Sequence, residues 1–362
     1  MEFIGVFLLF LPFLFLLWLA NVADLRRAMT PPRNTAGALV YALLVGLWLI
    51  ILGAGVTVVL LGVAYQRYAD IPTMMELYQK QGVDPETMVA LMHSLPRLGV
   101  GFIVISLAGL SVLLPPVRRL LARVLAISPD SVVHTVALSY SVLIFINLWL
   151  VLGMGVDTLL GMMEAEPAAP ESAASSQMIG LVWGQDIALA LMAFVGVGWL
   201  SRRSWHSALQ RLGLVWPSWN DIAAGVGLGI GMFLLLIPIG LLMEQLGLGL
   251  DTEIEQLTKE MLGPLLTSLP GVITLGLAAA LGEELVFRGA LQPRFGVFLT
   301  ALLFAFTHSQ YVISVATLVV FLLGLVLGWV RIRRNTSTAM ILHATYNIAI
   351  GLVGLLAAQM MK

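Results

Sequence analysis

The chain has 362 residues, of which 59% are hydrophobic and 11% charged, and its mean hydropathy is +0.97. This composition excludes an ordinary water-soluble globular protein and predicts a membrane protein that crosses the lipid bilayer several times. The formal net charge of −1 gives no reason to expect a nucleic-acid partner, and the absence of cysteine excludes disulfides, thiolate metal sites and thiol catalysis.

Long apolar runs predict an all-α fold, a polytopic bundle of about ten transmembrane helices with interfacial amphipathic helices. The first run lacks the basic start of a secretory signal, so we expect it to be retained as a span. Pro115 and Pro116 end the third span, and the arginines after them predict a short interfacial helix. We expect a polar loop at 66–95 and a flexible acidic linker at 164–177. The first five spans are predicted at 3–20, 36–64, 100–114, 131–152 and 178–200.

Residues 201–218 form a basic stretch with tryptophan anchors, which favours a helix at the membrane surface. This stretch divides the chain into an N-terminal five-span region of unknown role at 1–200, an interfacial linker at 201–218, and a C-terminal core at 219–362 that contains the polar motifs. The later spans are predicted at 221–243, from 264 or 271 to 287, and at 295–308, 312–330 and 336–360.

Lysine and arginine cluster in alternate loops, after the odd-numbered spans, whereas the loops between them are acidic or almost uncharged. Because basic loops stay on the cytoplasmic side, both ends of the chain are expected outside the cell. The same rule places the C-terminal end of the seventh span near the cytoplasm. We therefore expect a multi-pass protein of a bacterial plasma membrane whose polar site lies toward the cytoplasmic side.

Two adjacent glutamates and an arginine interrupt the seventh apolar run, within Gly-Glu-Glu-Leu-Val-Phe-Arg-Gly at 282–289. An unpaired carboxylate in a membrane interior is costly, so such groups are paired or functional. Glu284 and Arg288 are four residues apart, which puts them on one helical face and allows a salt bridge. Glu283 points about 100° away. An ion pair at the helix end is the simplest interpretation of one glutamate. The second glutamate needs a different partner, which weakens this interpretation.

Two further pairs with helical spacing lie downstream, Phe304 with His308 and His343 with Asn347. Each pair alone is explained by packing or by hydrogen bonds between membrane helices. Together with the glutamates they supply a carboxylate, two imidazoles and an amide, which are the groups needed to activate water and stabilise an oxyanion. The combination therefore predicts hydrolytic chemistry.

These motifs resemble those of the CPBP family of intramembrane proteases, which includes the type II CAAX prenyl endopeptidases and the bacteriocin-processing and immunity (ABI) proteins. Residues 283–288 match EExxxR, residues 304–308 match FxxxH and residues 343–347 match HxxxN, within a resemblance that covers about 210–355. It implies an intramembrane endopeptidase that acts on a peptide or membrane protein in the bilayer. The catalytic residues that it implies are Glu283, Glu284, His308, His343 and Asn347, with Arg288 and Phe304 in support.

The resemblance also implies a role for each residue. Glu283 is the base that activates water, His308 orients the water, and His343 and Asn347 stabilise the oxyanion. Zinc is the one cofactor that these residues suggest, with Glu284, His308 and His343 as its ligands. A His-Glu-x-x-His motif is absent, and Glu284 cannot serve both Arg288 and a metal, so the sequence favours water activated without tightly held zinc.

Two other functions stay open at this point. The first is a catalytically inactive family member that acts as a membrane scaffold or an immunity protein. The second is a transporter, in which Asp157 and Asp186 of the N-terminal region would belong to an ion path. Hydrogen bonds between helices are the favoured interpretation of these two aspartates. The sequence predicts neither the identity of the substrate nor an oligomeric state.

Overall fold

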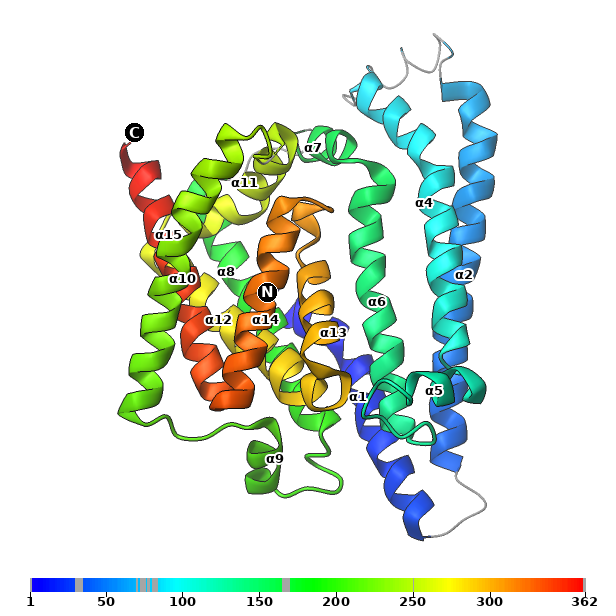
Figure 1. The fold of residues 1–362 in the computed structure, drawn as a ribbon. Helices are drawn as coiled ribbons and strands as arrows, with labels where there is room; N and C mark the ends of the chain where they lie inside the picture. The colour runs from blue at the N-terminus through cyan, green and yellow to red at the C-terminus, as the bar shows by residue number, and fades with distance from the viewer. Residues whose placement is uncertain are drawn as a thin grey trace.

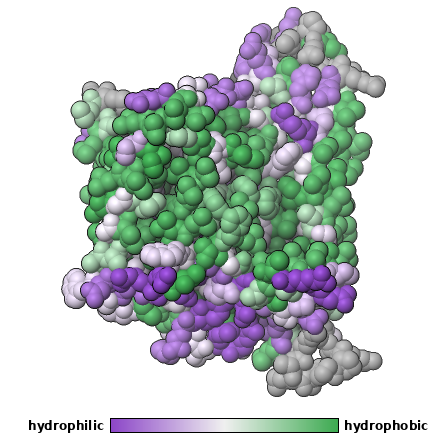
Figure 2. Space-filling view, viewed as in Figure 1, coloured by the Kyte–Doolittle hydropathy of each residue, from purple (hydrophilic) through white to green (hydrophobic). Residues whose placement is uncertain are grey.

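The computed structural model describes residues 2–29, 35–69, 71, 76, 79, 84–164, 170–249 and 251–360. Over these residues the fold is a helical bundle, and an isolated bridge between Trp199 and Arg203 is the only β-type pairing. Polar residues form two bands separated by a broad apolar belt (Figure 2), as expected for a protein that spans a bilayer. The predicted all-α polytopic fold is confirmed.

The N-terminal part contains both long and short helices. The long helices α2 and α4 pair along one edge of the bundle, while α1, α6 and α8 lie closer to its centre (Figure 1). Their bounds are α1 Glu2–Met29, α2 Thr35–Ala69, α4 Pro85–Ser111, α5 Pro115–Leu121, α6 Val132–Met154, α7 Val156–Glu164 and α8 Glu171–Gly196.

The C-terminal part begins with the short helix α9, which lies at the same end of the bundle as α5 (Figure 1). Ser218 then starts α10 with a capping box, in which its hydroxyl and the Asp221 carboxylate each accept a backbone N–H of the other residue. The bounds are α9 Trp205–Leu212, α10 Trp219–Gln245, α11 Thr252–Leu266, α12 Leu269–Glu284, the π-helix η1 Leu285–Leu291, α13 Gln292–Thr307, the 3₁₀ turn η2 Ser309–Tyr311, α14 Val315–Arg333 and α15 Thr336–Met360.

The described residues include nine helical segments long and apolar enough to cross a membrane. The predicted seventh and eighth spans fall into one of them, the 39-residue segment Leu269–Thr307. Its backbone leaves helical geometry at Gly296, where φ is 78° and ψ is 169°, a conformation that glycine adopts without the steric cost of a Cβ. After this kink α13 runs back along the bundle in the direction opposite to α12 (Figure 1). The two predictions therefore correspond to α12 and α13.

Two predicted loops are too wide. The loop at 66–95 is shorter because α2 continues to Ala69 and α4 already begins at Pro85, where the Asp84 carboxylate caps the helix by accepting the Thr87 N–H at 2.8 Å. Of the linker at 164–177, residues 165–169 lie outside the described residues. The rest is not a linker, since α8 begins at Glu171 and the Ser175 hydroxyl is buried 3.3 Å from that of Ser268.

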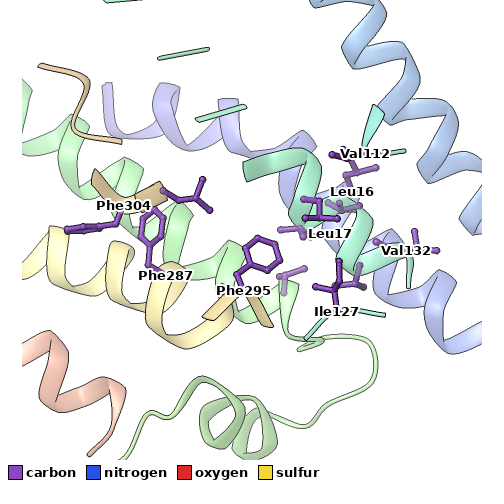
Figure 3. Close-up of a cluster of buried hydrophobic side chains, with 14 of the residues drawn as sticks. Leu16, Leu17, Val112, Ile127, Val132, Phe287, Phe295 and Phe304 are labelled. Atoms are coloured by element: carbon purple, nitrogen blue, oxygen red, sulfur yellow. The ribbon is translucent and has the colours of Figure 1, made fainter. Parts of the chain in front are cut away.

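One hydrophobic core joins the two halves of the chain. Buried side chains of α1, α2 and α6 form a single cluster with those of η1, α13, α14 and α15. Figure 3 shows this continuity, from Leu16 and Leu17 of α1 to Phe287, Phe295 and Phe304 of the C-terminal part. The motif-bearing helices are therefore held by the N-terminal helices and do not form a separately packed core.

Candidate active site

The motif at 282–289 lies where α12 passes directly into the π-helix η1. We predicted an α-helix through residue 287, but the α-helix ends at Glu284. A π-helix is hydrogen-bonded from each residue to the fifth along the chain, and such segments occur frequently at functional sites. Both glutamates lie in the last turn of α12, where consecutive side chains point about 100° apart, and Arg288 lies in η1.

Glu284 lies on the packed side of this junction. Its side chain is completely buried, and its Oε1 lies 3.2 Å from Arg288 Nη1, which is the predicted ion pair. The same oxygen accepts a hydrogen bond from His343 Nδ1 of α15 at 3.0 Å. One carboxylate oxygen thus ties α12, η1 and α15 together.

Arg288 is held from two other directions. Its Nη2 donates to the Gly324 carbonyl of α14 at 3.3 Å. Its guanidinium lies over the ring of Phe304, 4.2 Å from the centroid, at a distance where a cation is attracted to an aromatic face. Phe304 therefore supports the site as a platform for Arg288, and its ring also lies between His343 and His308, at centroid distances of 5.8 Å and 5.0 Å.

Glu283 lies on the open side. Its side chain is 18% exposed, and its Oε2 lies 3.9 Å from His343 Nε2. No group of the described residues forms a hydrogen bond with this oxygen. Because Nδ1 of the same imidazole donates to Glu284, the neutral ring presents the lone pair of Nε2 toward Glu283. His343 thus connects the two carboxylates.

Asp186 of α8 is a further carboxyl group at this place. It is only 2% exposed, and its Oδ1 has no hydrogen-bond partner within the described part of the chain. It packs against Gly282, where a Cβ would overlap the carboxylate and the backbone of Asp186. The interhelix hydrogen bond favoured from the sequence is not present at Oδ1. The sequence feature that indicates a polar site here is a lone carboxylate in an apolar span with no basic residue one helical turn away.

His308 and Asn347 are less closely joined to the glutamates. His308 ends α13 and its Nδ1 lies 3.0 Å from the Phe304 carbonyl. Asn347 donates to the Leu275 carbonyl of α12 at 3.1 Å, which fastens α15 to α12. The structure thus gathers Glu283, Glu284, Arg288 and His343, places His308 beyond the Phe304 ring, and directs one Asn347 hydrogen to the backbone.

The predicted zinc ligands are not assembled. The described residues include no group of three or more His, Asp or Glu side chains that could hold a metal ion. Glu284 already faces the Arg288 guanidinium at 3.2 Å, and this cation would repel a metal held by the same oxygen. The donor set of Glu284, His308 and His343 therefore does not fit zinc.

A chamber of about 530 Å³ opens beside Glu283. Its walls come from α1, α6, α8, η1 and α13, and most of the side chains that line it are apolar. Asp157, which the transporter alternative grouped with Asp186, is exposed on α7 and does not line this chamber. Glu283 is the only carboxylate among the described residues that line it. The open space therefore leads to one carboxylate of the pair.

One continuous segment of the chain contains Glu283, Glu284, Arg288 and His343. Residues 265–349 match the family model described as Type II CAAX prenyl endopeptidase Rce1-like. This chain contains an Rce1-like segment. The segment includes all three motifs, which confirms the resemblance predicted from them. Three chamber walls, α1, α6 and α8, lie outside the Rce1-like segment.

A curated relative matches a shorter stretch. The "Uncharacterized protein YpbD" of Bacillus subtilis (strain 168) is 39% identical over 67 residues, which cover 17% of this chain and 35% of that protein. The match thus spans about a third of the relative's length. No solved structure matches the chain significantly.

Proposed function

We propose that this protein is an intramembrane endopeptidase that hydrolyses a peptide bond with water activated by Glu283. The observation that carries the proposal is the unequal environment of the two glutamates. Glu284 is completely buried and its Oε1 contacts both Arg288 and His343, whereas Glu283 is 18% exposed and lines the chamber. The Rce1-like segment supports the proposal because it contains these residues and its family is one of CAAX-type endopeptidases.

The separation of Glu283 Oε2 and His343 Nε2 suits one water molecule. At 3.9 Å the two atoms are too far apart for a direct hydrogen bond. A water between them can donate one hydrogen to each, because both atoms are acceptors in this arrangement. Such a water is polarised by two acceptors and directs an oxygen lone pair toward the chamber, where a substrate carbonyl would lie.

The reaction then follows general acid–base catalysis. Glu283 takes a proton from the water as the water oxygen bonds to the carbonyl carbon, which forms a tetrahedral oxyanion. The C–N bond breaks when Glu283 returns this proton to the departing nitrogen. His343 positions the water, and Glu284 fixes the tautomer of His343. Asn347 keeps one amide hydrogen, which it could direct to the oxyanion together with His308.

The setting within the bilayer suggests what enters the chamber. The basic loops lie at one end of the bundle, with α5 and α9 (Figure 1), so we assign this end to the cytoplasm. Glu283 follows fourteen residues of α12 that descend toward that end. The substrate in this proposal is a peptide or membrane protein whose scissile bond lies at the cytoplasmic side of the membrane.

The proposal is tested with full-length protein in lipid nanodiscs and a library of membrane-anchored peptides, with cleavage read by mass spectrometry. We expect defined cleavage products with wild-type protein and none with Glu283→Gln. An exposed glutamate at the end of α10 gives a matched control, since Glu244→Gln should cleave as wild type does. Peptides that bind but remain intact with every variant would support the scaffold alternative instead.

A further inference from the structure

Four arginines line one end of the chamber that leads to Glu283. Two come from the loop after α8, one from α9 and one from α13, so they converge from separate elements. They are Arg202, Arg203, Arg211 and Arg294. Glu283 is the only acidic side chain among the described residues of this wall. The chamber therefore has a strongly cationic end.

Among the described residues no acidic side chain lines this end of the chamber, although the Asp24 carboxylate acts on Arg202 from outside it. Arg203 donates to the Val197 carbonyl at 2.6 Å, and Arg211 donates to the Gly289 and Ala290 carbonyls at 3.0 Å and 3.4 Å. Arg294 donates to the Ala126 carbonyl at 3.3 Å. Within the described ranges none of the four forms a salt bridge. Backbone carbonyls orient the guanidinium groups but do not neutralise them.

The cations also act on one another. Partial burial and then the neighbouring guanidinium groups of Arg294, Arg203, Arg331 and Arg202 together lower the pKa of Arg211 to about 10. An arginine ordinarily stays charged well above this pH. Four cations held close together in a partly buried place favour the binding of an anion, because an anion would relieve their repulsion.

The rest of the chamber has the opposite character. Beyond the arginines most of its wall is formed by apolar side chains of α1, α6, α8 and η1, among them Phe13, Leu17, Ile144, Leu189 and Phe287. A volume of about 530 Å³ falls within the usual range of small-molecule sites. The cationic end is at the level of α9, at the polar edge of the apolar belt (Figures 1 and 2). This is the depth at which phospholipid headgroups lie.

We propose that the chamber binds an anionic phospholipid, with the phosphate headgroup on the four arginines and an acyl chain along the apolar wall toward Glu283. The proposal concerns the chamber of the proposed endopeptidase, but it does not require catalysis. The lipid would occupy the same space as a substrate. In the active enzyme, anionic lipid should therefore compete with cleavage.

The test is lipid binding by full-length protein in neutral detergent, measured by native mass spectrometry with phosphatidylglycerol and phosphatidylcholine of identical chains. We expect a preference for phosphatidylglycerol that falls about tenfold or more in the Arg203→Gln, Arg211→Gln, Arg294→Gln triple variant. The matched control is the double variant Arg119→Gln, Arg123→Gln, because both arginines are exposed at the same end of the bundle and neither lines the chamber. The control should keep the preference.

A second variant tests the chamber without touching the arginines. Leu189→Trp adds bulk to the apolar wall and should reduce binding of the long-chain lipid while thermal stability is retained. Inorganic phosphate distinguishes a lipid site from a simple anion site, and it should displace the lipid only weakly. Displacement by phosphate as effective as by lipid would overturn the proposal, as would an equal loss of binding in the Arg119, Arg123 control.

The outcome is separable from that of the proposed function. Lipid selectivity in a protein that cleaves nothing would leave this inference standing and overturn the endopeptidase. Peptide cleavage by a protein with no preference for anionic lipid would support the endopeptidase and overturn the lipid site.

Discussion

The two sides of the α12–η1 junction differ although they are built on adjacent residues. On the packed side, Glu284 and Arg288 are almost fully buried and bonded in several directions. On the open side, Glu283 is 18% exposed and lines the chamber. A carboxylate that is enclosed by a cation and an imidazole holds helices together, whereas a carboxylate inside a membrane protein that lines an open chamber indicates function. The contrast assigns structure to one side and chemistry to the other.

Removal of the open-side carboxylate should have the largest effect. Glu283→Gln keeps the shape but cannot accept a proton, so the rate of peptide cleavage should fall by about 10²–10⁴-fold. Thermal stability should stay near that of wild type, because Glu283 Oε2 makes no hydrogen bond within the described residues. Cleavage rates and melting temperatures of the same preparation check both parts. A stable, fully active Glu283→Gln protein would contradict the assignment.

Removal of the packed-side cation should instead unfold the protein. Arg288→Ala leaves Glu284 buried and charged without its counter-ion, a loss of about 3–5 kcal/mol. Arg334 offers a matched control, because it pairs with Asp221 at the same distance of 3.2 Å but is 39% exposed. Arg334→Ala should cost less than about 1 kcal/mol. Thermal unfolding in detergent measures both, and equal losses would remove the distinction between the two sides.

The contact between α8 and α12 should show an intermediate effect. A methyl group at Gly282 would overlap Asp186 and push the helices apart, so Gly282→Ala should destabilise the protein by about 1–3 kcal/mol and slow cleavage by displacing Glu283. Gly227 of α10 has no atom within 4 Å of an added Cβ. Gly227→Ala should leave stability unchanged or raise it by up to about 1 kcal/mol. Denaturation curves compare the stability of the two variants. An unchanged stability of Gly282→Ala would show that α8 and α12 are not tightly packed at Gly282.

Asn347 should have the smallest structural effect among these residues. Asn347→Ala removes the hydrogen bond to the Leu275 carbonyl, and such bonds between membrane helices contribute about 0.6 kcal/mol on average. Its effect on the cleavage rate separates the two roles of the side chain. A loss of cleavage rate much larger than the loss of stability indicates an oxyanion contact. Similarly small losses of cleavage rate and of stability indicate that Asn347 only holds α15 against α12.

Metal removal should have no effect. Glu284 is engaged by Arg288 and His343, and the described residues provide no three-ligand group. Cleavage should therefore be unchanged after dialysis against a strong zinc chelator and after subsequent addition of zinc. Loss of activity on chelation, restored by zinc alone, would show that the side chains rearrange around a metal.

Local spacing predicted the packed side well. Residues four apart in a helix meet on one face, and this rule alone placed Glu284 beside Arg288 and separated Glu283 from both. The length of the apolar runs, which is also a local property of the sequence, located the motif-bearing spans. It could not predict the π-helix, because the same residues fit an α-helix equally well by pattern.

The open side depends on contacts between distant parts of the chain. Asp186 meets Gly282 across almost one hundred residues, and no local pattern indicates such a pair. The arginines of the chamber were interpreted as cytoplasmic loop charges and as part of a basic helix at the membrane surface, because both interpretations explain them without any knowledge of where they converge. The role of the region at 1–200 was likewise hidden until its helices were seen to form three walls of the chamber. The division at 200 and 218 stays a prediction.

The difference between the two glutamates can be measured directly, because the chain contains no cysteine. Single variants Glu283→Cys and Glu284→Cys are treated with a small charged methanethiosulfonate in nanodiscs, and labelling is followed over time, with denatured protein as the reference for full reactivity. A thiol that faces a water-accessible chamber reacts, whereas a packed one is protected. We expect Glu283→Cys to be labelled many times faster than Glu284→Cys in the folded protein. Equal rates, or faster labelling at Glu284, would contradict the assignment of chemistry to Glu283 and of structure to Glu284.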